Sequence, residues 1–458
     1  MTGTAPWQPI KLALLMQSAS GVHPASWRHP AAVRGAANSI DYYARMAQVA
    51  ERGLFDLFFV ADTPAARTRN LEAWSRYPLF MNTLEPLTLL ACLAASTSRI
   101  GLGGTASTSF GEPYTIARQF GTLDHVSHGR AAWNVVTSAN EYVAQNFGQD
   151  ALPPHAERYE RAREFVDVVQ ALWDTYEDDA IVEDQAGGQY FDPERFHPLD
   201  HRGKYFSVRG ALNLARSPQG QPVIIQAGAS ETGKEFAAQV AEVVFGTATD
   251  LAEAKAFYDD LKGRMTKYGR RPDEMKILCG RGVVLGATRQ EAEEKFDALQ
   301  ALMHPTVGRF FLGNDLEMDL SDLPLDEPIP ADLIPKSARF HQAYFAQIVD
   351  LIRKENPTLR QLYLRYERGR TTLKGTARDV ADDMEAWIDA GAADGFMLTF
   401  NQLPEDLTAF VDQVVPELQR RGRYRAAFEG VTLRDHLGLA RPPNRRSTAG
   451  RVPVGESR

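Results

Sequence analysis

Short apolar runs alternate with amphipathic segments along most of the chain. Eight of these runs have the length and composition of buried strands, and they cover residues 10–16, 54–62, 99–107, 131–138, 222–228, 243–249, 275–286 and 394–400. Amphipathic helices are predicted between strands; one covers residues 38–53, with Asn38 as its cap, and another covers residues 155–173. Apolar strands that alternate with helices predict a parallel sheet covered by helices.

Eight strand and helix units favour an α/β fold of the (β/α)8 type, a TIM barrel, although an open doubly wound sheet produces a similar pattern. Such a barrel needs about 250 residues, and the chain has 458. The surplus falls in insertions at about residues 63–85, 177–220 and 300–372. We therefore predict one barrel domain over residues 1–425, followed by a C-terminal arm at residues 426–458.

Composition and charge narrow the class of protein. The chain has 51 Lys and Arg against 59 Asp and Glu, a formal net charge of −8, which disfavours nucleic acids and anionic membranes as partners. No apolar run approaches the roughly 20 residues of a membrane helix, and the N-terminus has no signal-peptide pattern. Cys92 and Cys279 form no disulfide or zinc motif. We expect a cytoplasmic protein without a structural metal.

Polar side chains follow the predicted strands at the end where barrel enzymes place their chemistry. These residues are Asp62 at the end of the second strand, Ser107 and Thr108 at the end of the third, and Asn134, Thr137 and Ser138 at the fourth. Capping or turn preferences explain any one of them alone. Their coincidence on one rim predicts a binding site.

The segment from Gly228 to Gly233 leads from the fifth strand into a helix, so the first amides of that helix would point outward together and favour a phosphate. Ser230 would add a hydrogen bond; the alternative is that it only caps the helix. A hydrolase nucleophile elbow requires glycine where Thr232 stands, which disfavours that class.

Two further features carry candidate chemistry. His155 and Tyr159 are four residues apart on one helix face and could hold an anion together. The alternative, equally compatible with the sequence, is that they are exposed surface residues without a binding role. His23, in the loop after the first strand, is a candidate acid or base or a simple loop residue. Residues 101–106 match a dinucleotide fingerprint only weakly, because no helix begins there.

Several segments together resemble the bacterial luciferase-like flavin monooxygenase superfamily, over roughly residues 8–425. The resemblance is strongest to its branch of nitrilotriacetate monooxygenase, pristinamycin synthase and dibenzothiophene-sulfone monooxygenase. The segments are MQSASGVHPASWRHP, FFVAD, TASTSFGEPYTIARQFGTLDHVSHGRAAWNVVTS, PPHAERYERAREFVDVVQALW, DHRGKYFSVRGALNLARSPQGQPVIIQAGASETG and TARDVADDMEAWIDAGAADGFML.

The resemblance implies a TIM barrel that binds reduced FMN (FMNH2), with the flavin supplied by a separate NAD(P)H:flavin reductase and O2 as co-substrate. It assigns the flavin ring to Asp62, Thr108 and Asn134, and the ribityl chain and phosphate to His155, Tyr159 and Ser230. Many relatives have a second hydroxyl residue where this chain has Ala229, so backbone amides would replace one phosphate contact. A homodimer or homotetramer follows by family analogy.

The insertion at 300–372 is either a linker or a lid. As a lid it would exclude water and select the substrate, with His304 and His341 on it; His23 and His341 are the candidate catalytic residues. We expect a two-component monooxygenase that oxidises a C–N, C–S or similar bond of a small organic molecule. The alternatives are an F420-dependent oxidoreductase of the same superfamily, a non-catalytic flavin-binding protein and, with no ligand cluster to support it, a metal-dependent hydrolase.

Overall fold

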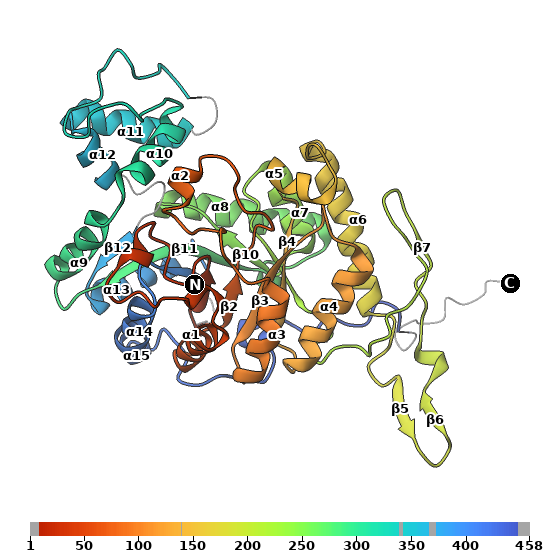
Figure 1. Cartoon of the computed structure of the whole chain (residues 1–458). Coiled ribbons are helices and arrows are strands. Elements are labelled where there is room, and N and C mark those ends of the chain that lie inside the picture. The colour runs from red at the N-terminus through yellow and green to blue at the C-terminus, as the bar shows by residue number, and fades with distance from the viewer. Residues whose placement is uncertain (1–8, 139, 339–341, 366–371, 448–458) are drawn as a thin grey trace.

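Eight parallel strands form a closed barrel at the centre of the computed structural model, which describes residues 9–138, 140–338, 342–365 and 372–447 (Figure 1). The strands are β1 (Lys11–Met16), β2 (Leu57–Val60), β3 (Gly101–Ser107), β4 (Ala131–Val136), β9 (Val223–Gln226), β10 (Val243–Gly246), β11 (Lys276–Leu285) and β13 (Gly395–Phe400). Each pairs in parallel with the next, and β13 pairs with β1 to close the ring. The predicted (β/α)8 barrel and all eight predicted strands are confirmed. A further strand, β12 (Thr372–Gly375), pairs with the end of β11 and was not predicted.

Helices surround the barrel. They are α1 (Ile40–Arg52), α3 (Pro86–Ser96), α4 (Pro113–Val126), α6 (His155–Trp173), α7 (Glu231–Val240), α8 (Leu251–Arg264), α9 (Arg289–Ala301), α13 (Ala377–Asp389), and the pair α14 (Glu405–Ala409) and α15 (Val415–Arg420). The cap of α1 is Ser39, whose side chain accepts a hydrogen bond from the Tyr42 amide, so the prediction of Asn38 was wrong by one residue. Helix α9 was not predicted.

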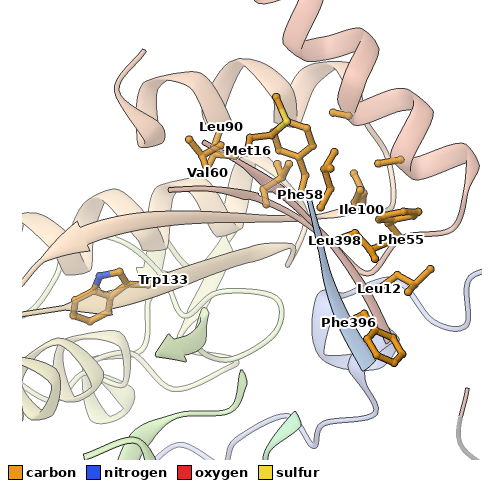
Figure 2. Packing of buried hydrophobic residues seen from close by; sticks show 14 of the residues in the cluster. Leu12, Met16, Phe55, Phe58, Val60, Leu90, Ile100, Trp133, Phe396 and Leu398 are labelled. Carbon is orange, nitrogen blue, oxygen red and sulfur yellow. The ribbon is translucent and has the colours of Figure 1, made fainter. Parts of the chain in front are cut away.

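The strands are apolar throughout because both of their faces are buried. Leu12 and Leu14 point outward into a large cluster between the barrel and its helices, part of which Figure 2 shows with Phe58 and Leu398. Ala13, between the two leucines, belongs to a second cluster inside the barrel. A strand with two buried faces reads as a continuous apolar run rather than an alternating one, which explains why the sequence pattern was clear.

The amino-terminal end of the barrel is closed by α16 (Leu433–Leu437), which lies within the predicted C-terminal arm. Leu433 and Leu437 are fully buried in the inner cluster. A Cβ atom on Gly101, at the start of β3, would lie 2.5 Å from Leu433 Cδ1 and 2.7 Å from the Asp56 carbonyl oxygen, so a larger residue would displace the backbone as well as α16. The described part of the arm is therefore packed against the barrel; the domain boundary at residue 425 stays a prediction.

The three predicted insertions differ in structure. The first contains the short helix α2 (Leu71–Trp74), and the second contains the hairpins β5 (Ile181–Asp184) to β6 (Gln189–Phe191) and β7 (His201–Arg202) to β8 (Ser207–Val208). The third contains α10 (Pro305–Leu316), α11 (Gln342–Glu355) and α12 (Leu359–Arg365), which group together at the edge of the molecule (Figure 1).

These three helices share an apolar cluster of their own, so the described part of the third insertion, which we call the helical insertion, is a folded unit. Whether it moves as a lid stays a prediction. None of the helices in the described ranges has both the length and the apolar character needed to cross a membrane.

Candidate active site

The carboxyl ends of β2, β3, β4 and β9 surround a cavity of about 300 Å³, which we call the strand-end cavity. Asp62, Thr105, Ser107, Tyr159 and Gly228 are among the residues that line it. These five come from the ends of β2, β3 and β9 and from α6, and Val135 and Val136 of β4 complete the wall, so the closed barrel brings four strand ends to one edge. Two of the predicted cofactor residues, Asp62 and Tyr159, therefore share one cavity.

Hydrogen bonds made by hydroxyl side chains order the β3 and β4 ends of this cavity. The Ser107 and Ser138 hydroxyl oxygens lie 2.8 Å apart, and the Ser109 hydroxyl donates to the Thr137 carbonyl at 2.7 Å. Thr108 is buried, and both its amide and its hydroxyl donate to the Val136 carbonyl, at 2.9 and 3.1 Å. Thr108 thus joins the two strand ends, and its hydroxyl proton is already used.

Asn134 is the predicted site residue with an unmet hydrogen-bonding group. Its Nδ2 donates to the Thr105 hydroxyl at 3.0 Å, whereas its Oδ1 is buried and accepts no hydrogen bond within the described residues. A buried acceptor without a donor costs about 1–3 kcal/mol. The side chain therefore fits a ligand that brings an N–H or O–H group to this place.

The carboxyl of Asp62 has a changed acidity. Burial raises the pKa of Asp62 to about 6, an effect that the Thr63 amide opposes and the Glu85 charge reinforces. The group therefore exchanges its proton close to neutral pH. A carboxyl with this pKa can donate or accept a hydrogen bond at the cavity wall.

The other end of the strand-end cavity contains the glycine turn between β9 and α7. Ser230 is exposed and caps α7, its hydroxyl oxygen accepting the Gly233 N–H at 3.1 Å. A Cβ on Gly233 would lie 3.0 Å from both the Tyr159 hydroxyl and the Gly228 Cα, so the turn is a close-packed cradle. The exposed His155 ring lies 4.8 Å from the Tyr159 ring.

Tyr159 thus lines the cavity near the glycine turn, with His155 against its ring and Ser230 at the start of α7, while Asp62 lines the strand ends and Asn134 is bonded to Thr105 of that wall. The capping role of Ser230 is present, and its own hydroxyl proton remains able to donate to an anion. The unmatched Asn134 oxygen and the glycine cradle together fit a long ligand with a polar ring at one end and a phosphate at the other, as FMN has.

A second cavity, of about 450 Å³, lies between the barrel mouth and the helical insertion; we call it the aromatic cavity. His23, from the β1 loop, and Asn401, after β13, line its barrel side. His23 Nδ1 accepts the Ala25 N–H at 3.1 Å, so Nε2 carries the proton and donates to Gln300 Oε1 at 2.9 Å. The structure brings His23 to this cavity, whereas His341 lies outside the described residues.

Most of the remaining lining of the aromatic cavity was not identified from the sequence. It includes Arg67, Trp74 and Tyr77 from the first insertion and Phe311, Tyr344 and Tyr363 from the helical insertion. The signal available was the close spacing of aromatic residues in both insertions, as in Trp74 with Tyr77.

Residues 19–394 match a family model described as luciferase-like monooxygenase. The chain belongs to this family. It is 47% identical over 444 residues to component A of nitrilotriacetate monooxygenase from Aminobacter aminovorans, covering 95% of this chain and 97% of that one. It is 44% identical to N-acetyl-S-(2-succino)cysteine monooxygenase from Bacillus subtilis, with 96% and 99% covered.

Among solved structures of the family, the EDTA monooxygenase of Chelativorans sp. BNC1 is similar, with a TM-score of 0.77 and 34% sequence identity. The alignment covers 95% of this chain and all of that one. The resemblance to the family and to its nitrilotriacetate branch is therefore confirmed, and the chain spans the length of these relatives.

Proposed function

We propose that this protein is a two-component flavin-dependent monooxygenase that uses FMNH2, supplied by a separate NAD(P)H:flavin reductase, and O2 to oxidise a small organic molecule. The observation that carries the proposal is the strand-end cavity, which Asp62 lines at the strand ends and Gly228 lines at the glycine turn. The buried, unmatched oxygen of Asn134 lies behind its wall, because Asn134 is hydrogen-bonded to Thr105 of the lining. Membership of the luciferase-like monooxygenase family supports it. The relative named "component A" supports a separate partner for flavin reduction.

The residues at the strand ends would hold the flavin ring, and those at the turn its tail. Asn134 would accept a hydrogen bond through Oδ1, and Thr108 would keep the β3 and β4 ends in place. His155, Tyr159 and Ser230 would hold the ribityl chain and phosphate. Bound FMNH2 supplies the two electrons that allow one atom of O2 to enter the substrate and the other to leave as water.

The protein's own groups control protons and water around this chemistry. Asp62, with its pKa raised to about 6, can hold a proton at the wall of the strand-end cavity. His23 presents a proton at Nε2, held by Gln300, beside the aromatic cavity, and is our candidate catalytic residue together with His341. The helical insertion covers the aromatic cavity and would exclude water from it.

We also propose that the enzyme acts in the cytoplasm as a homodimer or homotetramer. The β5–β6 hairpin projects from the molecule, and its Tyr190 side chain is 65% exposed, which supports contact with a second copy (Figure 1). Sedimentation of the protein and of a Tyr190→Ser variant tests this point; a monomeric wild type would contradict it.

Anaerobic titration with FMNH2 tests the proposed function. We expect saturable binding of one flavin, and we expect Asn134→Leu to weaken it about tenfold because the acceptor is lost. With a flavin reductase, NADH and O2, the wild type should form hydrogen peroxide when no substrate is present. When substrate is added, it should form an oxygenated product. Absence of any affinity for FMNH2 would refute the proposal. Turnover with reduced F420 in the absence of oxygen would favour the alternative oxidoreductase.

A further inference from the structure

Most of the described residues that line the aromatic cavity are apolar or aromatic, and one of them is charged. The aromatic side chains of this cavity come from the first insertion, from α9 and from the helical insertion: Trp74, Tyr77, Phe296, Phe311, Tyr344 and Tyr363. Arg67 is the only Lys, Arg, Asp or Glu among the described residues that line it. A ligand that fits the described part of this cavity therefore has a mainly apolar body and meets the positive charge of Arg67, with the polar side chains of His23, Gln300, Thr372 and Asn401 also on the wall.

The guanidinium of Arg67 is held in place, but its charge is not neutralised. It lies 3.9 Å from the centre of the Trp74 ring, and its Nη1 donates to the Leu79 carbonyl at 2.9 Å. Many arginines of the described chain pair with a carboxylate, as Arg76 does with Glu72 and Arg289 with Asp379. Arg67 has no carboxylate within ion-pair distance among the described residues. A half-buried guanidinium that retains free N–H groups is a binding site for a planar anion.

Packing between the two insertions fixes the position of Trp74 and hence of Arg67. The Trp74 ring stacks on Tyr77 at 5.7 Å and meets Phe310 of α10 edge-on at 5.4 Å. The arginine therefore rests on a platform that both insertions build. A fixed guanidinium loses little conformational entropy when it binds a carboxylate, which makes it selective.

Arg67 also lies next to the strand-end cavity. Pro64, three residues earlier, lines that cavity, and the Arg67 guanidinium lies 5.8 Å from the ring of Tyr142, whose neighbour Val143 lines it too. An anion bound by Arg67 would thus be held at the boundary between the two cavities, with the rest of the molecule in the aromatic cavity.

We infer that the substrate is an organic monocarboxylate with an aromatic or alkyl body, and that Arg67 is the residue that selects it by pairing with the carboxylate. The inference rests on the proposed function, because it takes the aromatic cavity as the substrate site. One guanidinium satisfies one carboxylate, so a molecule with several carboxylates would leave charges without partners among the described residues of these walls.

Calorimetric titration of the full chain with matched probes tests the inference. The probes are (phenylthio)acetate, which carries one carboxylate, its neutral analogue (phenylthio)acetamide, and nitrilotriacetate, which carries three. We expect the wild type to bind (phenylthio)acetate about 10- to 100-fold more tightly than the amide, the range for a charge-assisted hydrogen bond in a half-buried site. We expect nitrilotriacetate to bind more weakly than (phenylthio)acetate.

Variants at two arginines identify the residue responsible. Arg67→Ala should abolish the preference for the carboxylate over the amide, and Arg67→Lys should retain part of it because an ammonium keeps the charge but not the fork. Arg69→Ala removes the same charge from an exposed position two residues further on and should leave the preference unchanged.

Four results would overturn the inference. These are equal affinity of the wild type for (phenylthio)acetate and its amide, no measurable binding of (phenylthio)acetate, binding of nitrilotriacetate as tight as or tighter than that of (phenylthio)acetate, and an equal loss of affinity for both phenylthio probes in Arg67→Ala. Titration with FMNH2 on the same proteins keeps the two proposals separate, because flavin binding that persists in these cases would leave the proposed function intact.

Discussion

The strand-end cavity and the aromatic cavity both open at the carboxyl end of the barrel, but they are built from different parts of the chain. The strand-end cavity is formed by barrel strands, short hydroxyl side chains and a glycine turn, so the backbone sets its shape. The aromatic cavity is formed mainly by large side chains from two insertions and α9. A shape fixed by the barrel suits a cofactor, whereas side chains on insertions can change without disturbing the barrel and suit the choice of substrate.

The largest expected effect comes from adding a side chain in the glycine turn, which should damage the strand-end cavity and leave the aromatic cavity intact. A Cβ on Gly228 would lie 2.8 Å from Gln226 Nε2 and 3.0 Å from the Gly233 Cα, so Gly228→Ala must displace the wall of the strand-end cavity. We expect FMNH2 affinity to fall about 10- to 100-fold, the range for overpacking a close-packed site. Binding of (phenylthio)acetate should change less than twofold.

Gly263→Ala is the control for that substitution, because a Cβ on Gly263 meets open space on an outer helix. It should leave both affinities unchanged. Equal loss of flavin and probe binding in Gly228→Ala would show that the two cavities are not separate in the way we describe.

Removing the aromatic platform should affect only the other cavity. Trp74→Ala takes away the ring on which the Arg67 guanidinium rests and the contact between α2 and α10. We expect (phenylthio)acetate affinity to fall about tenfold, with FMNH2 affinity unchanged. Trp74→Phe keeps a ring at this position and should recover most of the loss; a variant that behaves like Trp74→Ala would argue against the platform.

The same contrast explains what could be read from the sequence. The strands were predictable because both faces of each are buried, and Asp62, Asn134 and Tyr159 followed from their places on strand ends and a helix face. Arg67 has no such signal, since its role depends on Trp74 and on a helix more than 200 residues away. The burial of Leu433 was hidden in the same way, because an arginine-rich tail gives no sign of the barrel end that it covers.

Local hydrogen bonds also decide what a correctly placed residue can do. Thr108 lies at the predicted strand end, yet its hydroxyl donates to the Val136 carbonyl, which no spacing in the sequence reveals. Asn134 is the opposite case, because its amide nitrogen is used while its oxygen is not. The sequence could predict the rim of the site but not which of its polar atoms remain available.

Ser230 allows a finer test of the strand-end cavity, because its cap on α7 and its proposed phosphate contact predict different results. Ser230→Ala should weaken FMNH2 binding about 2- to 10-fold through the lost hydroxyl donor. Reduced riboflavin, which has no phosphate, should bind to the variant and to the wild type equally well. If the variant lost the same affinity for both flavins, the hydroxyl would act only through the Gly233 cap.

The smallest expected effect concerns the proton on Asp62. Burial raises the pKa of Asp62 from 3.8 to about 6, so the folded protein holds this proton at pH values where an unfolded aspartate has lost it. The stabilisation from the protonated form is complete below about pH 4 and is lost as the pH rises to about 6. Asp62→Asn does not titrate, so its melting temperature relative to the wild type should be a few degrees higher at pH 7.5 than at pH 4. If the difference in melting temperature between Asp62→Asn and the wild type did not change with pH, Asp62 would not be held in its protonated form. Glu85→Gln removes the neighbouring charge that raises the Asp62 pKa, so its melting temperature relative to the wild type should show the same pH dependence to a smaller extent.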